Sequence, residues 1–292
     1  MKTNLDCVYC IIQKAGERYE KFNTDPSEKL LFMKKVFQLI GSSSEDVTAP
    51  FLSKCVNDLL KQEFGVTDEY KELKSHYNKQ MLELEDRINH EISLSDDPLL
   101  SALQFAMIGN FIDFGAMDTV DPNKLNELIQ SSETQTVNQS EYRLFREELK
   151  TAKTLVYLLD NAGEIVFDKI CMETIKNLYP NVRIRAVVRG FPVFNDATMQ
   201  DALEVGLDKV ADIMDNGTDI PGTQLDRICK EARNAVEQAD VIISKGQGNF
   251  ETLSGCEKNV YYMFLCKCDL FVRRFEVPQF SGLFVNEHRL EV

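Results

Sequence analysis

Histidine is scarce in this chain of 292 residues: the sequence has three, His76, His90 and His288, which lie far apart. A histidine-rich zinc site and a Ser-His-Asp triad both need histidine beside their other members, so the scarcity argues against each. Any catalytic metal would then be held by oxygen ligands, which favours Mg²⁺ or Mn²⁺.

Long apolar runs are also missing. No stretch approaches the roughly 20 apolar residues that a membrane-spanning helix needs. The first residues, 1–7, lack the apolar core of a signal peptide. The hydrophobic fraction of 43% is nevertheless that of an ordinary globular protein, enough to bury a core. We therefore expect a cytoplasmic globular protein without a membrane partner.

Basic residues are outnumbered: 33 Lys and Arg stand against 47 Asp and Glu, a net charge of −14. A chain this acidic repels the phosphates of nucleic acids and of anionic membranes, so neither is expected as a general partner. An anionic small-molecule substrate would need a local cation, either a metal ion or a well-placed lysine or arginine.

Eight cysteines are present, but only Cys7 and Cys10 have the CxxC spacing of metal ligands or of a redox pair. In a reducing cytosol these residues should be thiols. Two interpretations of the pair remain open. The thiols pack against the start of a helix, or they form half of a zinc site that Cys55 or Cys268 completes.

The first part of the chain, residues 1–130, is predicted to be a helical domain, because apolar residues recur there at helical spacing. Several helix starts carry a capping residue followed by proline. These helical segments cover roughly 26–40, 48–64, 68–92 and 95–112, with a short one from Asp121. The polar, aperiodic segment 131–140 is predicted to be a linker or exposed loop.

The second part, residues 141–292, is predicted to be an α/β domain. Short apolar runs rich in β-branched residues alternate there with helical patterns, which indicates a mainly parallel sheet covered on both faces. The five runs are 154–159, 182–188, 210–214, 240–244 and 260–265.

Oxygen-bearing side chains follow two neighbouring strands of this predicted sheet. Asp160 and Asn161 come directly after the first strand, and Asp196 lies in the crossover after the second. Ligands bind at the carboxyl ends of strands in open α/β sheets, and three such oxygens suit a hard divalent cation. The alternative from spacing alone is that these residues cap the helices that follow.

Two further motifs carry polar residues. Lys245-Gly246-Gln247-Gly248-Asn249 is a glycine-rich turn after the fourth predicted strand, and it could offer amides and an ammonium group to a phosphate. A flexible strand-to-helix turn is the alternative. Asn110 and Asp113 share one face of an otherwise apolar helix, either as structural hydrogen-bonding groups or as part of a site.

These motifs together resemble the damage-control phosphatase family, also called domain-of-unknown-function family 89. The resemblance follows the order of the chain over nearly its whole length, and Cys7-x-x-Cys10 is similar to the prokaryotic branch of that family. The matching segments are 109–114, 160–164, 195–198 and 245–251.

The resemblance implies a helical N-terminal part joined to a Rossmann-like three-layer α/β/α domain. It also implies a divalent metal, Mn²⁺, Mg²⁺, Ni²⁺ or Co²⁺, held by Asp160, Asn161 and Asp196, and phosphatase activity on small phosphorylated metabolites such as sugar phosphates. Catalytic roles fall to Asp160, Asp196, Asp113 and Lys245. Substrate contacts are expected from Asn110, Gly163, Glu164, Asn195, Lys245, Gly246 and Gly248.

The expected reaction is metal-assisted hydrolysis of a phosphomonoester, with Lys245 and the Gly246 and Gly248 amides stabilising charge on the phosphoryl oxygens. Asp196 or Asp113 would orient or deprotonate water, and covalent attack by an aspartate is the alternative. Two rival functions are an adenosylmethionine-dependent carboxyl methyltransferase and a non-catalytic module that binds metal through Cys7 and Cys10. The oligomeric state is not predicted.

Overall fold

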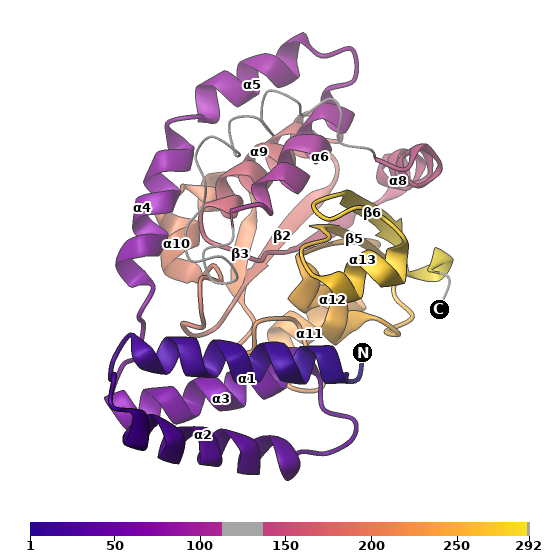
Figure 1. The fold of residues 1–292 in the computed structure, drawn as a ribbon. Coiled ribbons are helices and arrows are strands. Elements are labelled where there is room, and N and C mark those ends of the chain that lie inside the picture. The colour runs from indigo at the N-terminus through magenta and orange to yellow at the C-terminus, as the bar shows by residue number, and fades with distance from the viewer. Residues whose placement is uncertain (113–136, 291–292) are drawn as a thin grey trace.

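The structure, a computed structural model, describes residues 1–112 and 137–290. The N-terminal part of the described chain is helical, as predicted (Figure 1). Its helices are α1 (Leu5–Glu20), α2 (Pro26–Gly41), α3 (Ala49–Phe64), α4 (Lys71–Leu82), α5 (Glu85–Leu94) and α6 (Pro98–Gly109).

Local sequence explains where several of these helices begin and end. The side chains of Asp25, Thr48 and Asp97 accept hydrogen bonds from the first-turn amides of α2, α3 and α6, and a proline follows each within the first two helical positions. Gly65 ends α3 at a φ of 69°, a left-handed conformation that favours glycine. The periodic segment 68–92 proves to be two helices, α4 and α5.

From residue 139 onward the chain is α/β. The strands are β1 (Thr154–Leu158), β2 (Arg183–Val188), β3 (Asp212–Asp215), β4 (Val241–Lys245), β5 (Val260–Leu265) and β6 (Gly282–Asn286). The helices are α8 (Gln139–Thr151), α9 (Glu164–Leu178), α10 (Met199–Glu204), α11 (Lys230–Glu237), α12 (Gln247–Leu253) and α13 (Asp269–Phe275), and two 3-10 turns cover Leu207–Lys209 and Glu287–Arg289.

The strands form one sheet in the order β3-β2-β1-β4-β5-β6, in which only β6 is antiparallel. The chain runs outward from β1 through β2 to β3, returns to β4 on the other side of β1, and continues to β5. The carboxyl ends of β1 and β4 thus flank a topological switch point, where ligands of open α/β sheets bind.

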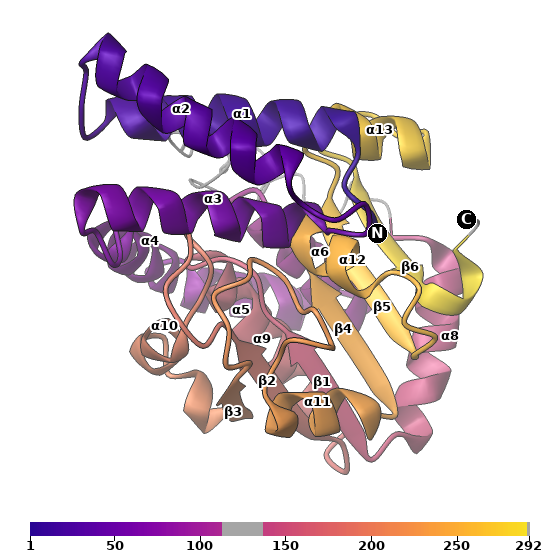
Figure 2. The same ribbon diagram turned by 90° about the horizontal axis from the view of Figure 1, so that it is seen from below.

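Helices cover both faces of the sheet (Figure 2). Along β1, Leu155 and Tyr157 face the core shared with α6 and α9, whereas Val156 and Leu158 face the core shared with α11 and α12. Alternate residues thus enter opposite cores, as expected for a strand buried on both faces. The predicted fold class, α/β with a mainly parallel sheet and a helical N-terminal part, is confirmed.

The helical part divides between two cores. Residues of α1, α2 and α3 form a core of their own, which includes Tyr19, Phe32 and Leu52. Helices α4, α5 and α6 instead contribute to the core on the α9 face of the sheet. That core contains Ile88 and Leu103. The three-helix unit α1–α3 is therefore the separately packed part of the helical region.

Other predictions need correction or lie outside the description. The predicted linker 131–140 runs too far, because α8 already begins at Gln139. Strand β6 was not predicted. The short helix expected from Asp121 lies outside the described residues.

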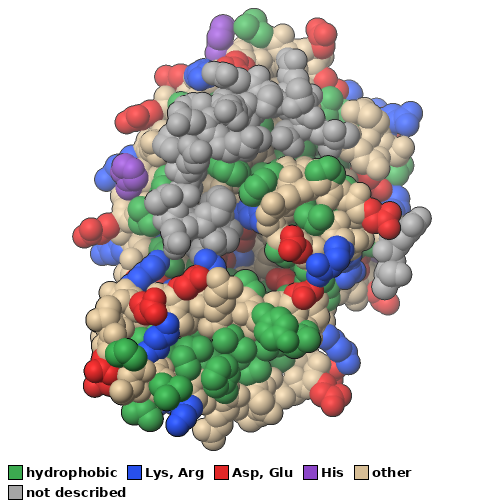
Figure 3. Space-filling view, viewed as in Figure 1, with side chains coloured by type: hydrophobic (Ala, Val, Ile, Leu, Met, Phe, Trp, Pro, Cys, Tyr) green, Lys and Arg blue, Asp and Glu red, His purple; other side chains and the backbone are tan. Residues whose placement is uncertain are grey.

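Exposed apolar side chains gather over α1 and α2, where Figure 3 shows them on the lower part of the molecule. Leu5, Tyr9, Leu30, Leu31 and Phe37 are each at least half exposed. Within the described ranges, no helix has both the length and the apolar character needed to cross a bilayer.

Candidate active site

The residues predicted to bind metal meet at the switch point of the sheet. Asp160 and Asn161 follow β1, and an antiparallel bridge joins Asn161 to Asp196 in the loop after β2. Two backbone hydrogen bonds hold this bridge, from the Ala162 amide to the Asn195 carbonyl (2.9 Å) and from the Ala197 amide to the Asp160 carbonyl (2.7 Å). The chain fold thus brings Asp160, Asn161 and Asp196 together.

These three side chains offer oxygen donors in a nearly buried position, at 9%, 3% and 4% exposure for Asp160, Asn161 and Asp196. The Asn161 amide group donates to Asp160 Oδ2 (2.9 Å). Burial raises the pKa of Asp160 well above its ordinary value, and the neighbouring carboxylates of Glu164 and Asp196 raise it further. Such a crowded set of acidic oxygens fits a hard divalent cation.

The donor set is two carboxylates and one amide. Among the residues that the structure describes, no three His, Cys, Asp or Glu side chains are grouped as metal ligands.

Gly246 makes room for Asp160. A Cβ atom at position 246 would lie 2.0 Å from Asp160 Oδ2 and 2.2 Å from its Cγ. The backbone there has φ 78° and ψ 160°, a combination almost confined to glycine. The Gly246 amide donates to the Met263 carbonyl (3.3 Å), so it is already engaged within the sheet.

Lys245, the last residue of β4, is completely buried. Its Nζ group donates to Glu164 Oε1 (2.7 Å), Asp168 Oδ1 (2.5 Å) and the Ala106 carbonyl (2.7 Å). Burial alone would lower the pKa of Lys245, but Asp168 and Glu164 outweigh it and raise that pKa above its ordinary value. The expected direct contact with phosphate does not fit this geometry, because all three ammonium hydrogens already have acceptors.

Glu164 and Asn110 lie beside Lys245 and Asp160, and both are 0% exposed. The Asn110 amide group donates to both Glu164 oxygens (2.9 and 3.1 Å) and to Asp160 Oδ2 (3.3 Å). Its side-chain oxygen accepts from the Leu265 amide (3.1 Å). Asn110 therefore connects the end of α6 with β1, α9 and β5, and its polar atoms are used within the protein.

The remaining expected substrate contacts are glycines and Asn195. The Gly163 amide donates to Asn78 Oδ1 (2.7 Å), and a Cβ on Gly163 would lie 2.9 Å from Ile112. A Cβ on Gly248 would lie 2.2 Å from the Pro221 carbonyl oxygen. These glycines allow close backbone packing around the site. Asp113, expected to be catalytic, lies outside the described residues.

The sequence analysis assigned no role to two buried charged residues that contact these side chains, Asp168 and Arg189. Asp168 lies one helical turn after Glu164 on α9, and burial raises its pKa although Lys245 opposes the shift. Arg189 follows β2 directly, is 1% exposed and donates from Nε to Asp196 Oδ2 (2.6 Å). A charged residue at the end of an apolar strand was the available signal, as it was for Asp160.

We define the acidic network as Asp160, Glu164, Asp168, Asp196, Arg189 and Lys245, all of them buried. Four carboxylates and two cations leave a formal charge of 2 − 4 = −2 when every group is ionised. Buried charge is costly unless it is balanced. A divalent cation would balance this network.

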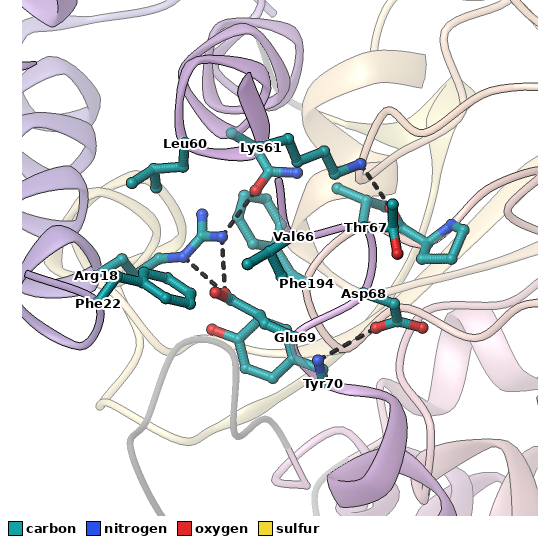
Figure 4. A pocket seen from close by; sticks show the side chains of 13 residues that line it. Arg18, Phe22, Leu60, Lys61, Val66, Thr67, Asp68, Glu69, Tyr70 and Phe194 are labelled. Atoms are coloured by element: carbon teal, nitrogen blue, oxygen red, sulfur yellow. Dashed lines mark hydrogen bonds and ion pairs between the residues drawn. The ribbon is translucent and has the colours of Figure 1, made fainter. Parts of the chain in front are cut away.

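The helical unit α1–α3 supports the loop that carries Asp196 (Figure 4). Arg18 of α1 lies over the Phe194 ring, 5.0 Å from its centroid, and Lys61 of α3 donates to the Pro192 carbonyl (3.0 Å). These residues line a pocket that none of the acidic network enters. Phe194 has a φ of 44°, an unusual conformation for a bulky residue, two positions before Asp196.

The CxxC pair, Cys7 and Cys10, lies apart from the acidic network in sequence and on another element. Cys7 and Cys10 are in the first turns of α1, and Cys7 Sγ lies 3.8 Å from Glu251 Oε1 of α12. Cys268, rather than Cys55, is close enough to affect the pKa of both thiols. Burial is the main cause that raises the pKa of Cys7, to about 12, so this residue is a thiol at neutral pH.

Comparison with known proteins identifies a family whose model matches this chain. A family model described as the damage-control phosphatase ARMT1-like domain matches residues 3–283. An uncharacterised protein of Methanocaldococcus jannaschii is 35% identical over 277 residues, which cover 92% of this chain and 90% of that protein.

Two relatives carry functional names. A damage-control phosphatase of Pyrococcus horikoshii is 28% identical over 96% of both chains, and one of Archaeoglobus fulgidus is 36% identical over 72% of both. A crystal structure of a family 89 protein from P. horikoshii superposes with a TM-score of 0.85 at 28% identity, covering 98% of this chain and 99% of that one.

Gly246→Ala tests the packing of Asp160 against the backbone of position 246. The added methyl group would overlap the carboxylate, so we expect Asp160 to move and divalent-metal affinity, measured by calorimetry, to fall by roughly tenfold or more. Gly255→Ala is the matched control, because Gly255 also has a positive φ, 90°, but nothing lies within 4 Å of its added Cβ. Equal metal affinity in the two variants would contradict the packing argument.

Glu251→Gln tests the half-buried carboxyl group beside Cys7. Burial raises the pKa of Glu251 from 4.5 to about 7. Between these values the unfolded chain releases a proton that the folded state keeps, so stability contributed by this group falls as pH rises from about 4.5 to 7. Above pH 7 the full cost is present, at most about 3 to 4 kcal/mol, since one pKa unit corresponds to about 1.4 kcal/mol.

We therefore expect Glu251→Gln to stabilise the protein at pH 8 relative to wild type, with little effect at pH 4.5. Urea unfolding across that range measures the difference. Glu237→Gln, at an exposed position of α11, should leave the profile unchanged. A wild-type pH profile in Glu251→Gln would show that Glu251 is ionised throughout.

Proposed function

This chain belongs to the family of damage-control phosphatase ARMT1-like domains, and on that premise we propose that it is a metal-dependent phosphatase that hydrolyses phosphomonoesters of small metabolites. Asp160, Asn161 and Asp196 would hold the metal. Two relatives named damage-control phosphatase support the class of reaction. Sugar phosphates or damaged phosphometabolites are the proposed substrates.

One observation carries the proposal: the oxygen donors of Asp160, Asn161 and Asp196 converge at the switch point of the sheet, within a buried network of formal charge −2. A divalent cation and a phosphoryl group have complementary requirements at such a place. The cation needs acidic oxygens, and the phosphoryl group needs positive charge.

The bound cation, Mn²⁺, Mg²⁺, Ni²⁺ or Co²⁺, would supply Lewis acidity toward a phosphoryl oxygen. The chain's own residues do the rest. Asn110 and Lys245 fix Glu164, and Glu164 in turn accepts from the Asn161 amide group (3.0 Å). Lys245 is thus a positioning residue, which keeps the Asp160-Asn161 turn in one conformation.

The nucleophile follows from the same arrangement. Asp196, and Asp113 by its place in the sequence motif, are the proposed groups that orient or deprotonate the attacking water. Covalent attack by an aspartate on phosphorus is the alternative pathway: the ester alcohol would leave, and water would then hydrolyse the phosphoaspartate. Burial of all but a small part of Asp160 limits the access of bulk water to either reaction.

A reducing, intracellular compartment is proposed as well, because all eight cysteines are free. A zinc ion at Cys7 and Cys10 would be a separate structural feature, with Cys268 as the nearest further thiol. Phosphate hydrolysis at an oxygen site needs no thiolate, so this pair is not assigned to catalysis.

Asp160→Asn and Asp196→Asn test the assignment. Each keeps the side-chain volume but removes an anionic ligand, so we expect metal affinity to fall by roughly tenfold or more and turnover by roughly 100-fold or more. The readouts are calorimetric metal titration and phosphate release from a metal-supplemented phosphometabolite library. Asp215→Asn is the matched control, an exposed carboxylate at the end of β3.

Wild-type turnover in a folded Asp160→Asn or Asp196→Asn protein would refute the site. Absence of phosphate release by the wild type with every metal would refute the proposed reaction. Methyl transfer from adenosylmethionine without a divalent metal would instead favour the carboxyl methyltransferase alternative.

A further inference from the structure

Arg189 has an unusual set of contacts for a buried cation. Nε donates to Asp196 Oδ2 (2.6 Å), and Nη1 donates to Asn249 Oδ1 (3.2 Å). Nη2 is also buried, but it has no hydrogen-bond partner among the described residues. Its ion-pair neighbour is Asp160, whose Oδ1 lies 3.5 Å away.

An unsatisfied nitrogen on a buried guanidinium group calls for an explanation, because a charged donor that loses water without gaining an acceptor is costly. The two cations of the acidic network differ in this respect. Lys245 has three acceptors for its three hydrogens. Arg189 keeps donors uncommitted on the side of Asp160.

The guanidinium group is also held in a fixed orientation. Asn249, which accepts from Nη1, donates its own amide hydrogens to the carbonyl groups of Leu159 (3.0 Å) and Lys245 (2.7 Å). The ends of β1 and β4 thus determine where Asn249 points, and Asn249 determines where Arg189 points. A donor that is preorganised in this way needs little rearrangement when an anion arrives.

We propose that Arg189 is the phosphate-binding cation of this site, and that its Nη2 group donates hydrogen bonds to an oxygen of the phosphoryl group bound beside Asp160. This inference rests on the proposed phosphatase function and assigns to Arg189 the contact that the sequence motif suggested for Lys245. Guanidinium suits the task because its planar donors match the oxygens of phosphate.

On this assignment, Lys245 and Arg189 have different roles. Lys245 pairs with Glu164 and Asp168 inside the protein. Arg189 neutralises Asp196 through Nε and leaves Nη2 for the substrate. Positive charge is then available where charge on the transferred phosphoryl group has to be stabilised.

Inorganic phosphate, the product of the proposed reaction, is the probe. We expect Arg189→Lys to weaken phosphate binding, measured by calorimetry on Mg²⁺-loaded protein, by about 10- to 100-fold, the range for one charge-assisted hydrogen bond. Mg²⁺ affinity, measured without phosphate, should change by less than about threefold, because lysine keeps the positive charge. Arg189→Gln should lose more phosphate affinity than Arg189→Lys.

Arg183→Lys is the matched control. Arg183 is at the opposite end of β2 and forms an exposed ion pair with Asp212, so its replacement should leave phosphate affinity unchanged. Unchanged phosphate affinity in folded Arg189→Lys would overturn the assignment. Equal losses of Mg²⁺ and phosphate affinity would also overturn it, since that result means Arg189 only holds Asp196 in place.

A measurement on wild type covers the case in which the variants do not fold. Nitrogen-15 NMR of the arginine side chains should show a guanidinium signal, other than that of Arg183, that shifts on phosphate addition to metal-loaded protein. No shifted arginine signal at saturating phosphate would overturn the inference.

The experiments distinguish failure of the proposed phosphatase function from failure of the proposed role of Arg189. Arginine-dependent phosphate binding without turnover of any phosphomonoester would refute the proposed phosphatase and support the role of Arg189 in anion binding. Robust turnover with the same phosphate inhibition in wild type and Arg189→Lys would refute the role of Arg189 and support the phosphatase.

Discussion

The buried ammonium group of Lys245 is the contact on which this site depends. It pairs with carboxylates on α9 and donates to a carbonyl group of α6, so one side chain joins β4 to two helices on the same face of the sheet. A charge without solvent is tolerable only when its partners are fixed at short range. The carboxyl end of β4, α6 and α9 must therefore keep their relative positions. Glu164 then stays beside the turn formed by Asp160 and Asn161.

The same constraint explains why charge accumulates next to Lys245. Glu164 and Asp168 satisfy the lysine, which leaves Asp160 and Asp196 facing Arg189 as their shared counter-charge. Burial and the neighbouring carboxylates raise the pKa of Asp160 although Arg189 and Lys267 oppose that shift, so ionising this group without a further cation is costly. On the proposed function, a divalent cation would offset this charge and Arg189 would face the anionic substrate. The proposal thus explains how a strongly acidic protein would bind a phosphate ester.

The strand ends were predictable from sequence because apolar runs and their polar termini are local signals. Asp160 directly follows a strand, and Asp196 lies in the loop after the neighbouring strand, as those signals indicated. The direction of Lys245 was not predictable, since it depends on carboxylates of α9 far away in the sequence. Strand β6 was missed because an antiparallel edge strand gives only a short, weak pattern. The division of the helical part depends on which core each helix joins, and periodicity does not report that.

The unit α1–α3 has its own core, yet its position affects the site at the carboxyl ends of the strands. The loop after β2 leaves the sheet, passes through a bulky residue with positive φ at Phe194, and returns to pair Asn161 with Asp196. Such a backbone conformation persists only where surrounding contacts enforce it. Arg18 and Lys61 supply those contacts from α1 and α3. The helical unit is thus part of the framework that positions the second carboxylate.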